Sequence, residues 1–204
     1  MELREALTQI TEIRLQLART EVFRGYRAMP VAFSGVVALL AGVIQAATIA
    51  DPVTQVGAYL SLWIGAAVVS GAAAGLEMMV RARNATSPMT REMTWLALEQ
   101  FCPSLVAGAL LTIVLVRAAP EAAWMLPGLW QVVYSLGIFA SCRLLPRPTF
   151  WVAAFYLVSG LVVLATARGD ASLSPWAMAL PFGAGQLLAA AVLYSTLERD
   201  HAAD

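Results

Sequence analysis

Lysine is absent from the sequence, histidine occurs once and cysteine twice. Without lysine the chain cannot carry the G-x-x-x-x-G-K loop that binds nucleoside phosphates. The one histidine, His201, lies near the C-terminus, so there is no cluster of metal or haem ligands and no base inside an apolar segment to activate a serine. We therefore predict no metal, no cofactor and no catalytic residue, and we expect that the protein is not an enzyme.

The two cysteines, Cys102 and Cys142, do not form a C-x-x-C pair. Isolated thiols on the reducing side of a membrane stay free and behave as small apolar side chains. We therefore expect both cysteines to be reduced and buried, with no role in a disulfide.

Charge is scarce as well, because only 13% of the 204 residues are charged and the formal net charge is zero. A neutral chain has no general attraction to nucleic acid. Apolar residues make up 60% of the sequence, more than a soluble domain of this size can bury, so the excess must face lipid. The first thirty residues carry nine charges and no apolar core, which argues against a cleavable signal peptide.

Six segments have the roughly 20 apolar residues that a helix needs to cross a bilayer. Polar or proline-containing connections separate them, as is typical of helix ends at a membrane surface. The predicted spans are 31–50, 57–80, 94–116, 123–145, 149–167 and 174–197. The predicted fold class is therefore an all-α membrane protein with six transmembrane helices.

The distribution of arginine predicts the orientation. Eleven of the 13 basic residues lie before the first span, in the second and fourth connections, or after the last span; only Arg117 and Arg168 lie on the opposite side. Both termini are therefore predicted to be cytoplasmic, in the inner membrane of a bacterium. Tryptophans at the starts of four spans agree with an aromatic belt, whereas Trp63 and Trp130 lie deeper and are expected to pack between helices.

The N-terminal segment is predicted to be a cytoplasmic amphipathic helix, residues 1–28, before a transmembrane domain at 29–199 and a short tail at 200–204. Its apolar residues recur at spacings of three and four, which is the pattern of a helix with one apolar face. This helix either lies on the membrane surface or binds a partner or a second copy through residues 1–22. Its four glutamates argue against a polybasic lipid-binding motif.

An internal repeat is indicated by a small-Gly-aliphatic sequence in the first helix of each successive pair, at Gly35, Gly108 and Gly160. Leu62-Trp63 also aligns with Leu129-Trp130, so the six spans are predicted to form three tandem helical hairpins. With Gly42, Asp51-Pro52 and Gly71, this pattern resembles the HdeD-like family of bacterial acid-resistance membrane proteins over about residues 24–199. That resemblance implies a six-helix fold and a role in stress tolerance; the N-terminal amphipathic helix departs from it.

Two ionisable residues, Glu77 and Glu99, lie within predicted spans, near their cytoplasmic ends. Carboxylates inside a membrane are candidates for function. Glu77 has an ion-pair partner one turn away in Arg81. Glu99 precedes Pro103 by four residues, so its carbonyl lacks a helical donor, and Gln100 is adjacent. A transport site and a structural ion pair to loop arginines both remain open for Glu99.

Uncharged polar residues occur at mid-depth, among them Gln131, Tyr134 and Gln186. Such groups usually bond between helices, and the alternative is that they line a small cavity. Gly71 and Gly75 form a G-x-x-x-G motif, which is expected to serve internal helix packing, with a dimer face as the alternative.

The predicted function is a non-enzymatic inner-membrane protein of the structural, stress-related or partner-binding type. The alternative is a small-molecule or proton-coupled transporter or channel that uses Glu99 and the Gln131/Gln186 region.

Overall fold

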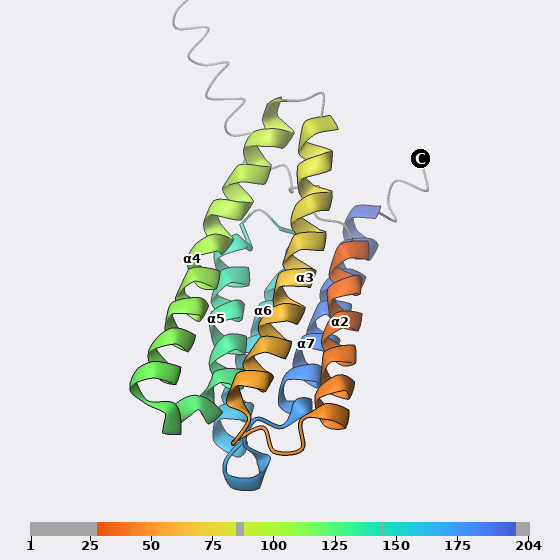
Figure 1. Ribbon diagram of the computed structural model, residues 1–204. Coiled ribbons are helices and arrows are strands. Elements are labelled where there is room, and N and C mark those ends of the chain that lie inside the picture. Colours follow the sequence, from red (N-terminus) through yellow and green to blue (C-terminus); the bar gives the residue numbers. More distant parts are fainter. Residues whose placement is uncertain (1–27, 85–87, 144, 199–204) are drawn as a thin grey trace, which may run out of the picture.

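The computed structural model describes residues 28–84, 88–143 and 145–198, and within these ranges it is helical without strands (Figure 1). Its six long helices are all apolar enough to cross a membrane, which confirms the prediction of six spans. Their bounds are α2 Ala28–Thr48, α3 Val56–Asn84, α4 Pro88–Ala118, α5 Leu126–Ser141, α6 Thr149–Thr166 and α7 Pro175–Leu193. The predicted N-terminal helix and the tail at 200–204 lie outside the described residues, apart from Ala28, which begins α2.

Helices α3 and α4 are longer than a bilayer requires. They contain 29 and 31 residues, against the roughly 20 that span the hydrocarbon core, and their upper ends in Figure 1 extend past the other helices. The apolar parts of these helices are Val56–Val80 and Glu99–Ala118. The first agrees with the predicted span 57–80 and the second overlaps most of the predicted span 94–116, because hydropathy reports where apolar residues stop. The flanking sequences Arg81-Ala82-Arg83 and Thr90-Arg91-Glu92-Met93 are polar but helix-compatible, so the helices continue through them.

Three connections, 49–55, 119–125 and 167–174, form the lower end of the molecule in Figure 1. In the first, the Asp51 carboxylate accepts bonds from the backbone N–H of Val53 at 3.1 Å and from the Thr54 hydroxyl at 2.9 Å. The Thr54 side chain is the largest cause of a lowered pKa for Asp51, since these donors favour the ionised carboxylate. This local turn ends α2 and prepares the chain for α3.

The other two connections carry short 3-10 helices, Pro120–Met125 before α5 and Gly169–Ala171 before α7. Arg168 lies 5.0 Å from the ring centroid of Trp124 and joins the two connections by a cation–π contact. Leu173 follows with a φ of 55°, a left-handed conformation that is uncommon for a branched residue and must be held by its surroundings. A π-helical turn, Tyr194–Glu198, extends α7 at the upper end.

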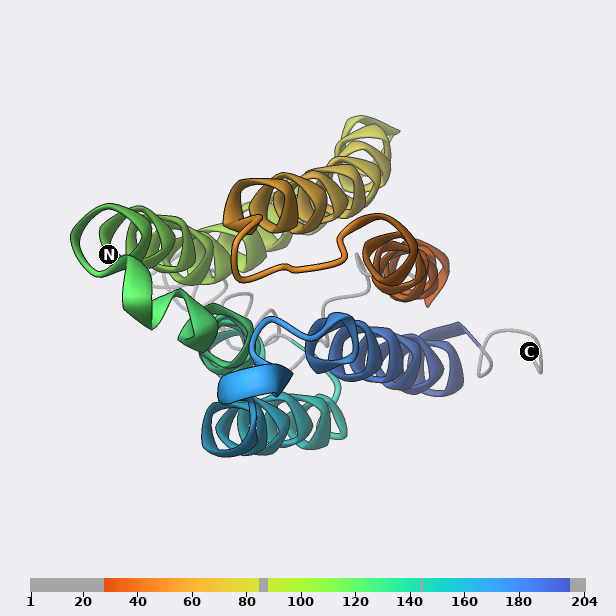
Figure 2. The same ribbon diagram turned by 60° about the horizontal axis from the view of Figure 1, so that its bottom comes forward.

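Packing joins the helices in the spatial order α3, α2, α7, α6, α5, α4 (Figure 2). The most extensive contacts are those of α2 with α7 and of α5 with α6, whereas α3 and α4 touch little. Figures 1 and 2 show α3 and α4 diverging toward the lower end. The consequence is an uneven share of burial: 44% of the fourth span is buried inside the protein, but only 6% of the third.

Candidate functional site

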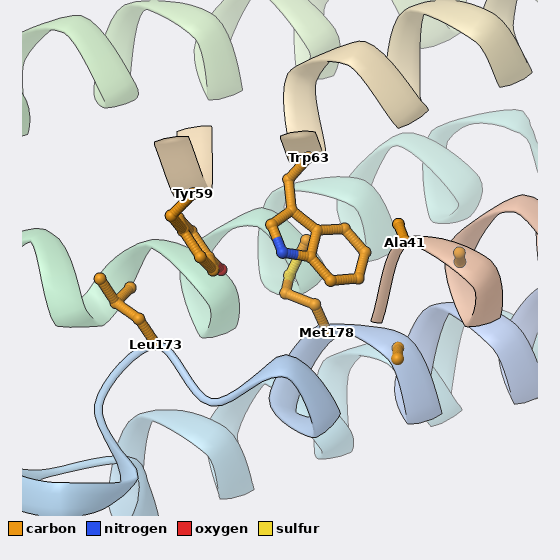
Figure 3. Packing of buried hydrophobic residues seen from close by; sticks show 7 residues of the cluster. Ala41, Tyr59, Trp63, Leu173 and Met178 are labelled. Atoms are coloured by element: carbon orange, nitrogen blue, oxygen red, sulfur yellow. The ribbon is translucent and has the colours of Figure 1, made fainter. Parts of the chain in front are cut away.

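A buried glutamine, Gln45 of α2, connects three segments near the lower end. Its side-chain nitrogen donates to the Leu173 carbonyl at 2.7 Å, and its side-chain oxygen accepts the indole N–H of Trp63 at 2.7 Å. Figure 3 shows Trp63 and Tyr59 pointing from α3 toward α7 and the segment that leads into it. The bond to Leu173 fixes the left-handed residue described above, so Gln45 ties α2 to α3 and to the start of α7.

A second tryptophan makes a matching bond in the next pair of helices. The indole N–H of Trp130 in α5 donates to the Thr112 hydroxyl of α4 at 2.8 Å. The two partners are 18 residues apart, as are Gln45 and Trp63. Trp63 is buried and Trp130 is half-buried, and both bond between helices, which confirms that these two residues pack between helices.

Gln131 of α5 is completely buried. Its side-chain nitrogen donates to the carbonyls of Pro127, at 3.1 Å, and of Ala177 in α7, at 2.9 Å. Its side-chain oxygen is buried without a hydrogen-bond partner among the described residues. A buried polar atom that is left unpaired costs about 1–3 kcal/mol, so this oxygen is an unsatisfied acceptor in the interior.

Gln186 of α7 reaches a different partner. Its side-chain nitrogen donates to the Tyr134 hydroxyl at 2.6 Å, and the Tyr134 ring lies edge-on to Phe101, Tyr156 and Phe182 with centroids 4.9 to 5.6 Å away. Edge-on aromatic pairs of this kind stabilise a packed core. The structure thus brings together two of the predicted polar residues, Tyr134 and Gln186. No described hydrogen bond joins them to the third, Gln131.

Neither of the predicted carboxylates is fully buried. Glu99 is exposed on α4, which is helical on both sides of Pro103 without interruption. Glu77 is half-buried on α3. Gln100 is half-buried, and its side-chain oxygen is buried without a partner in the part of the chain that the structure describes. Gln100 directly precedes Phe101, whose ring packs against Tyr134. Of the candidates on α4, Gln100 is therefore the one next to a residue of the aromatic cluster.

Glycines make the closest helix contacts. A Cβ atom added to Gly35 would lie 3.2 Å from the Gly183 carbonyl oxygen of α7, and one added to Gly160 would lie 2.8 Å from that of Gly128 in α5. Gly108 is looser, with a Val133 methyl at 3.9 Å. Gly71 and Gly75 have nothing within 4 Å of such an atom, so the expectation of internal packing for this G-x-x-x-G motif is not met among the described residues.

The two cysteines also differ in their environment, since one is half-buried and the other is exposed. Cys142 is half-buried and free, and its burial raises the pKa of its thiol. Cys102 is free but exposed on α4, so the expectation that it is buried is wrong. The reason is that α4 packs mainly against α5, and only 6% of its apolar span is buried inside the protein.

Gln45 belongs to the interior and was not singled out by the sequence. Gln45 is the one glutamine in an apolar segment of 21 residues, and an isolated amide at that depth was the signal that could have found it. Tyr59 is completely buried and stacks on Trp130 at 11°, with centroids 6.4 Å apart. Its hydroxyl has no hydrogen-bond partner among the described residues.

Every buried polar side chain in the described ranges is uncharged; they are Gln45, Thr112, Gln131, Ser135, Ser141 and Thr149. Gln45, Thr112 and Gln131 form hydrogen bonds between helices or segments, whereas Ser135 and Ser141 bond within α5. The side-chain oxygens of Tyr59, Gln100, Gln131 and Thr149 are buried without a partner among the described residues. Comparisons of the chain with protein-family models, with curated proteins and with solved structures find no match. The roles of these polar residues are therefore argued from their geometry alone.

Proposed function

We propose that this chain is a non-enzymatic protein of the bacterial inner membrane, with both termini in the cytoplasm, that acts as a structural or partner-binding bundle. The observation that carries the proposal is the neutral interior, in which Gln45, Gln131 and Gln186 each bond to another helix or connection. Such bonds fix helix positions and place no charge inside the bilayer. We assign partner binding to α3 and α4, whose spans are only 11% and 6% buried inside the protein, and, from their sequence, to residues 1–22.

We further propose that the bundle consists of three tandem hairpins, α2/α3, α4/α5 and α6/α7. The equal separation of the Trp63–Gln45 and Trp130–Thr112 pairs supports this arrangement for the first two hairpins. In the third, Gly185 of α7 packs against the Tyr156 ring of α6, and the Tyr156 hydroxyl donates to the Phe182 carbonyl of α7. If the HdeD-like resemblance holds, such an arrangement would accompany a role in stress tolerance.

Removal of residues 1–22 is expected to leave the bundle folded but to change its association. The reason is that the contacts described above begin at Ala28, in α2, whereas the apolar stripe of residues 1–22 has the periodicity of a binding helix. Light scattering in detergent would measure the mass of the complex, and tryptophan fluorescence would follow thermal unfolding. An unchanged mass and an unchanged capture of partners would remove residues 1–22 from the proposal.

A transporter is the second candidate, because the buried side-chain oxygens of Gln100 and Gln131 lack partners within the described residues. Unpaired acceptors of this kind could bind a permeating donor such as a protonated amine or a chain of water molecules. In this alternative Glu99, exposed beside Gln100, would receive the solute at the cytoplasmic end.

The structural proposal predicts no flux that depends on these residues. Proteoliposomes containing the full chain and an internal pH-sensitive dye should acidify, after an imposed pH gradient, at the same rate with Glu99→Gln and Gln131→Leu as with the unchanged chain. Thr48→Val, an exposed position bonded only within α2, is the control for effects of reconstitution. A rate above that of empty vesicles that falls in Glu99→Gln or Gln131→Leu but not in Thr48→Val would favour transport instead.

A further inference from the structure

Hairpins meet at one recurring type of contact, in which the second helix of one hairpin packs on the first helix of the next. We call this contact a seam. Between α5 and α6, Gly160 lies against Gln131, with 3.0 Å between an added Cβ and the Cβ of Gln131. Between α7 and α2, Gly42 lies against the Cβ of Ala179. In both seams a glycine of the first helix accepts a side chain of the second.

The tryptophan bonds give the register of the third seam, between α3 and α4. Gln131, which faces Gly160, directly follows Trp130, and Gly42 precedes Gln45, the partner of Trp63, by three residues. On the proposed hairpin arrangement, on which this step rests, we align the first two hairpins by these tryptophan bonds and not by the repeated glycines. The residue after Trp63 in α3 then corresponds to Gln131, and the residue three before Thr112 in α4 corresponds to Gly42. These are Ile64 of α3 and Ala109 of α4.

The third seam is open. Ile64 is 47% exposed, Ala109 is exposed, and the neighbouring Gly65 has nothing within 4 Å of an added Cβ. Further large apolar residues continue these two faces, namely Val68 on α3 and Val106 and Ile113 on α4, all more than half exposed. Both halves of a seam are therefore present, but each faces outward.

The chain cannot close this seam on itself without breaking other contacts. Tyr59 holds α3 against α5 by stacking on Trp130, and Trp130 in turn holds α4 through Thr112. Because Ile64 follows Trp63 by one residue, it points about 100° away from it on the helix, whereas Trp63 is turned inward (Figure 3). Moving α4 onto Ile64 would separate the Tyr59–Trp130 stack.

We propose that a second copy of this chain closes the seam: α3 of each copy receives α4 of the other, with Ile64 against Ala109. A two-fold axis along the membrane normal keeps both copies in the same orientation and makes each α3–α4 pair antiparallel, as α5–α6 and α7–α2 are. One rotation then closes two seams at once, and the interface is self-complementary. Small residues at Gly65 and Ala109 allow the close backbone approach that association inside lipid requires.

Cysteine cross-linking between differently tagged chains tests the proposed dimer. In a background of Cys102→Ser and Cys142→Ser, one chain carries Ile64→Cys and the other Ala109→Cys, and their membranes are treated with copper phenanthroline. The expected product carries both tags, runs at twice the 21.7 kDa of one chain and disappears on reduction, because the paired Cβ atoms fall within disulfide range. Val69→Cys, exposed on another face of α3, replaces Ile64→Cys as the control.

The other outcomes contradict the second copy in distinguishable ways. With both cysteines on one chain, an intrachain disulfide would show that α4 closes the seam within the molecule, which overturns the dimer and leaves the hairpin arrangement standing. Cross-linking between two Ile64→Cys chains would give an α3–α3 interface and overturn the register. The proposed interface would also be overturned if Val69→Cys cross-linked to Ala109→Cys as efficiently as Ile64→Cys does, or if Ile64→Cys and Ala109→Cys gave no cross-link between chains.

Discussion

Replacement of Gly160 by valine is expected to lower the free energy of unfolding by about 3 kcal/mol, at the upper end of the range for overpacked contacts. A Cβ atom at this position would lie 2.8 Å from the Gly128 carbonyl oxygen and 2.9 Å from a Val132 methyl group. The carbonyl oxygen belongs to the backbone of α5, so it cannot rotate away as a side chain could. Relief therefore requires α5 and α6, one of the two most extensively packed helix pairs, to move apart.

Titration with SDS in mixed micelles, followed by tryptophan fluorescence, would measure the change. Gly160→Ala provides a milder variant, expected to cost about 1 kcal/mol because it adds the Cβ alone, in case the valine variant does not fold. Gly71→Ala is the matched control, since its added methyl group meets nothing within 4 Å and alanine favours helix by up to about 1 kcal/mol. Equal effects of Gly160→Ala and Gly71→Ala would mean that Gly160 does not bring α5 and α6 together.

The six spans were predictable because hydropathy is a local property of the sequence. A run of about 20 apolar residues has no stable place other than a bilayer, whatever its neighbours do. The ends of α3 and α4 were less predictable, since polar residues such as Arg81 and Arg91 end an apolar run without ending a helix. The first end of α5 differed for the opposite reason: Pro120 and Pro127 bracket a 3-10 helix, so the regular helix begins at Leu126.

The contacts between helices were much less predictable, because they depend on how each helix is rotated. Gln131 and Gln186 both follow a proline and were candidates for one cavity, yet Gln131 bonds to the Ala177 carbonyl and Gln186 to the Tyr134 hydroxyl. Nothing local to either glutamine distinguishes these partners. Glu99 illustrates the same limit, since it is exposed on α4, the helix whose span is least buried of the six.

The glycines show that the same residue type can lie at a helix contact or away from one. Gly35, Gly160 and Gly71 have similar apolar neighbours in the sequence, but the first two lie at close helix contacts and the third faces open space. A small residue permits close approach without causing it. Which glycines are used is decided by the larger side chains that position the helices, such as Trp63 and Trp130.

Replacement of Gln45 by leucine is expected to destabilise the protein by about 2 kcal/mol, because the change leaves two buried groups unpaired. The indole N–H of Trp63 and the carbonyl of Leu173 would each lose the partner that now lies 2.7 Å away. Neither can turn to water in a buried site, although the unfolded chain in a membrane also finds partners, which moderates the loss. Leu173 would in addition lose a bond that holds its left-handed backbone.

A double-mutant cycle separates the Gln45–Trp63 bond from the rest of this cost. Trp63→Phe removes the indole N–H and keeps an aromatic ring near Tyr59, and the double variant removes both partners, so the cycle isolates their coupling. We expect a coupling of about 1 kcal/mol, within the range measured for hydrogen bonds between membrane helices. The larger loss in Gln45→Leu than in Trp63→Phe would then reflect the Leu173 bond.

Additive effects of the two substitutions would show that the indole and the amide do not interact, and would remove the register on which the third seam depends. The same Trp63–Gln45 bond fixes the rotation of α3, and that rotation turns Ile64 outward and leaves a seam face without a partner. We therefore expect that Gln45→Leu, if it still folds, no longer forms the Ile64–Ala109 cross-link between chains. A bond inside one copy would then determine which surface that copy presents to the other.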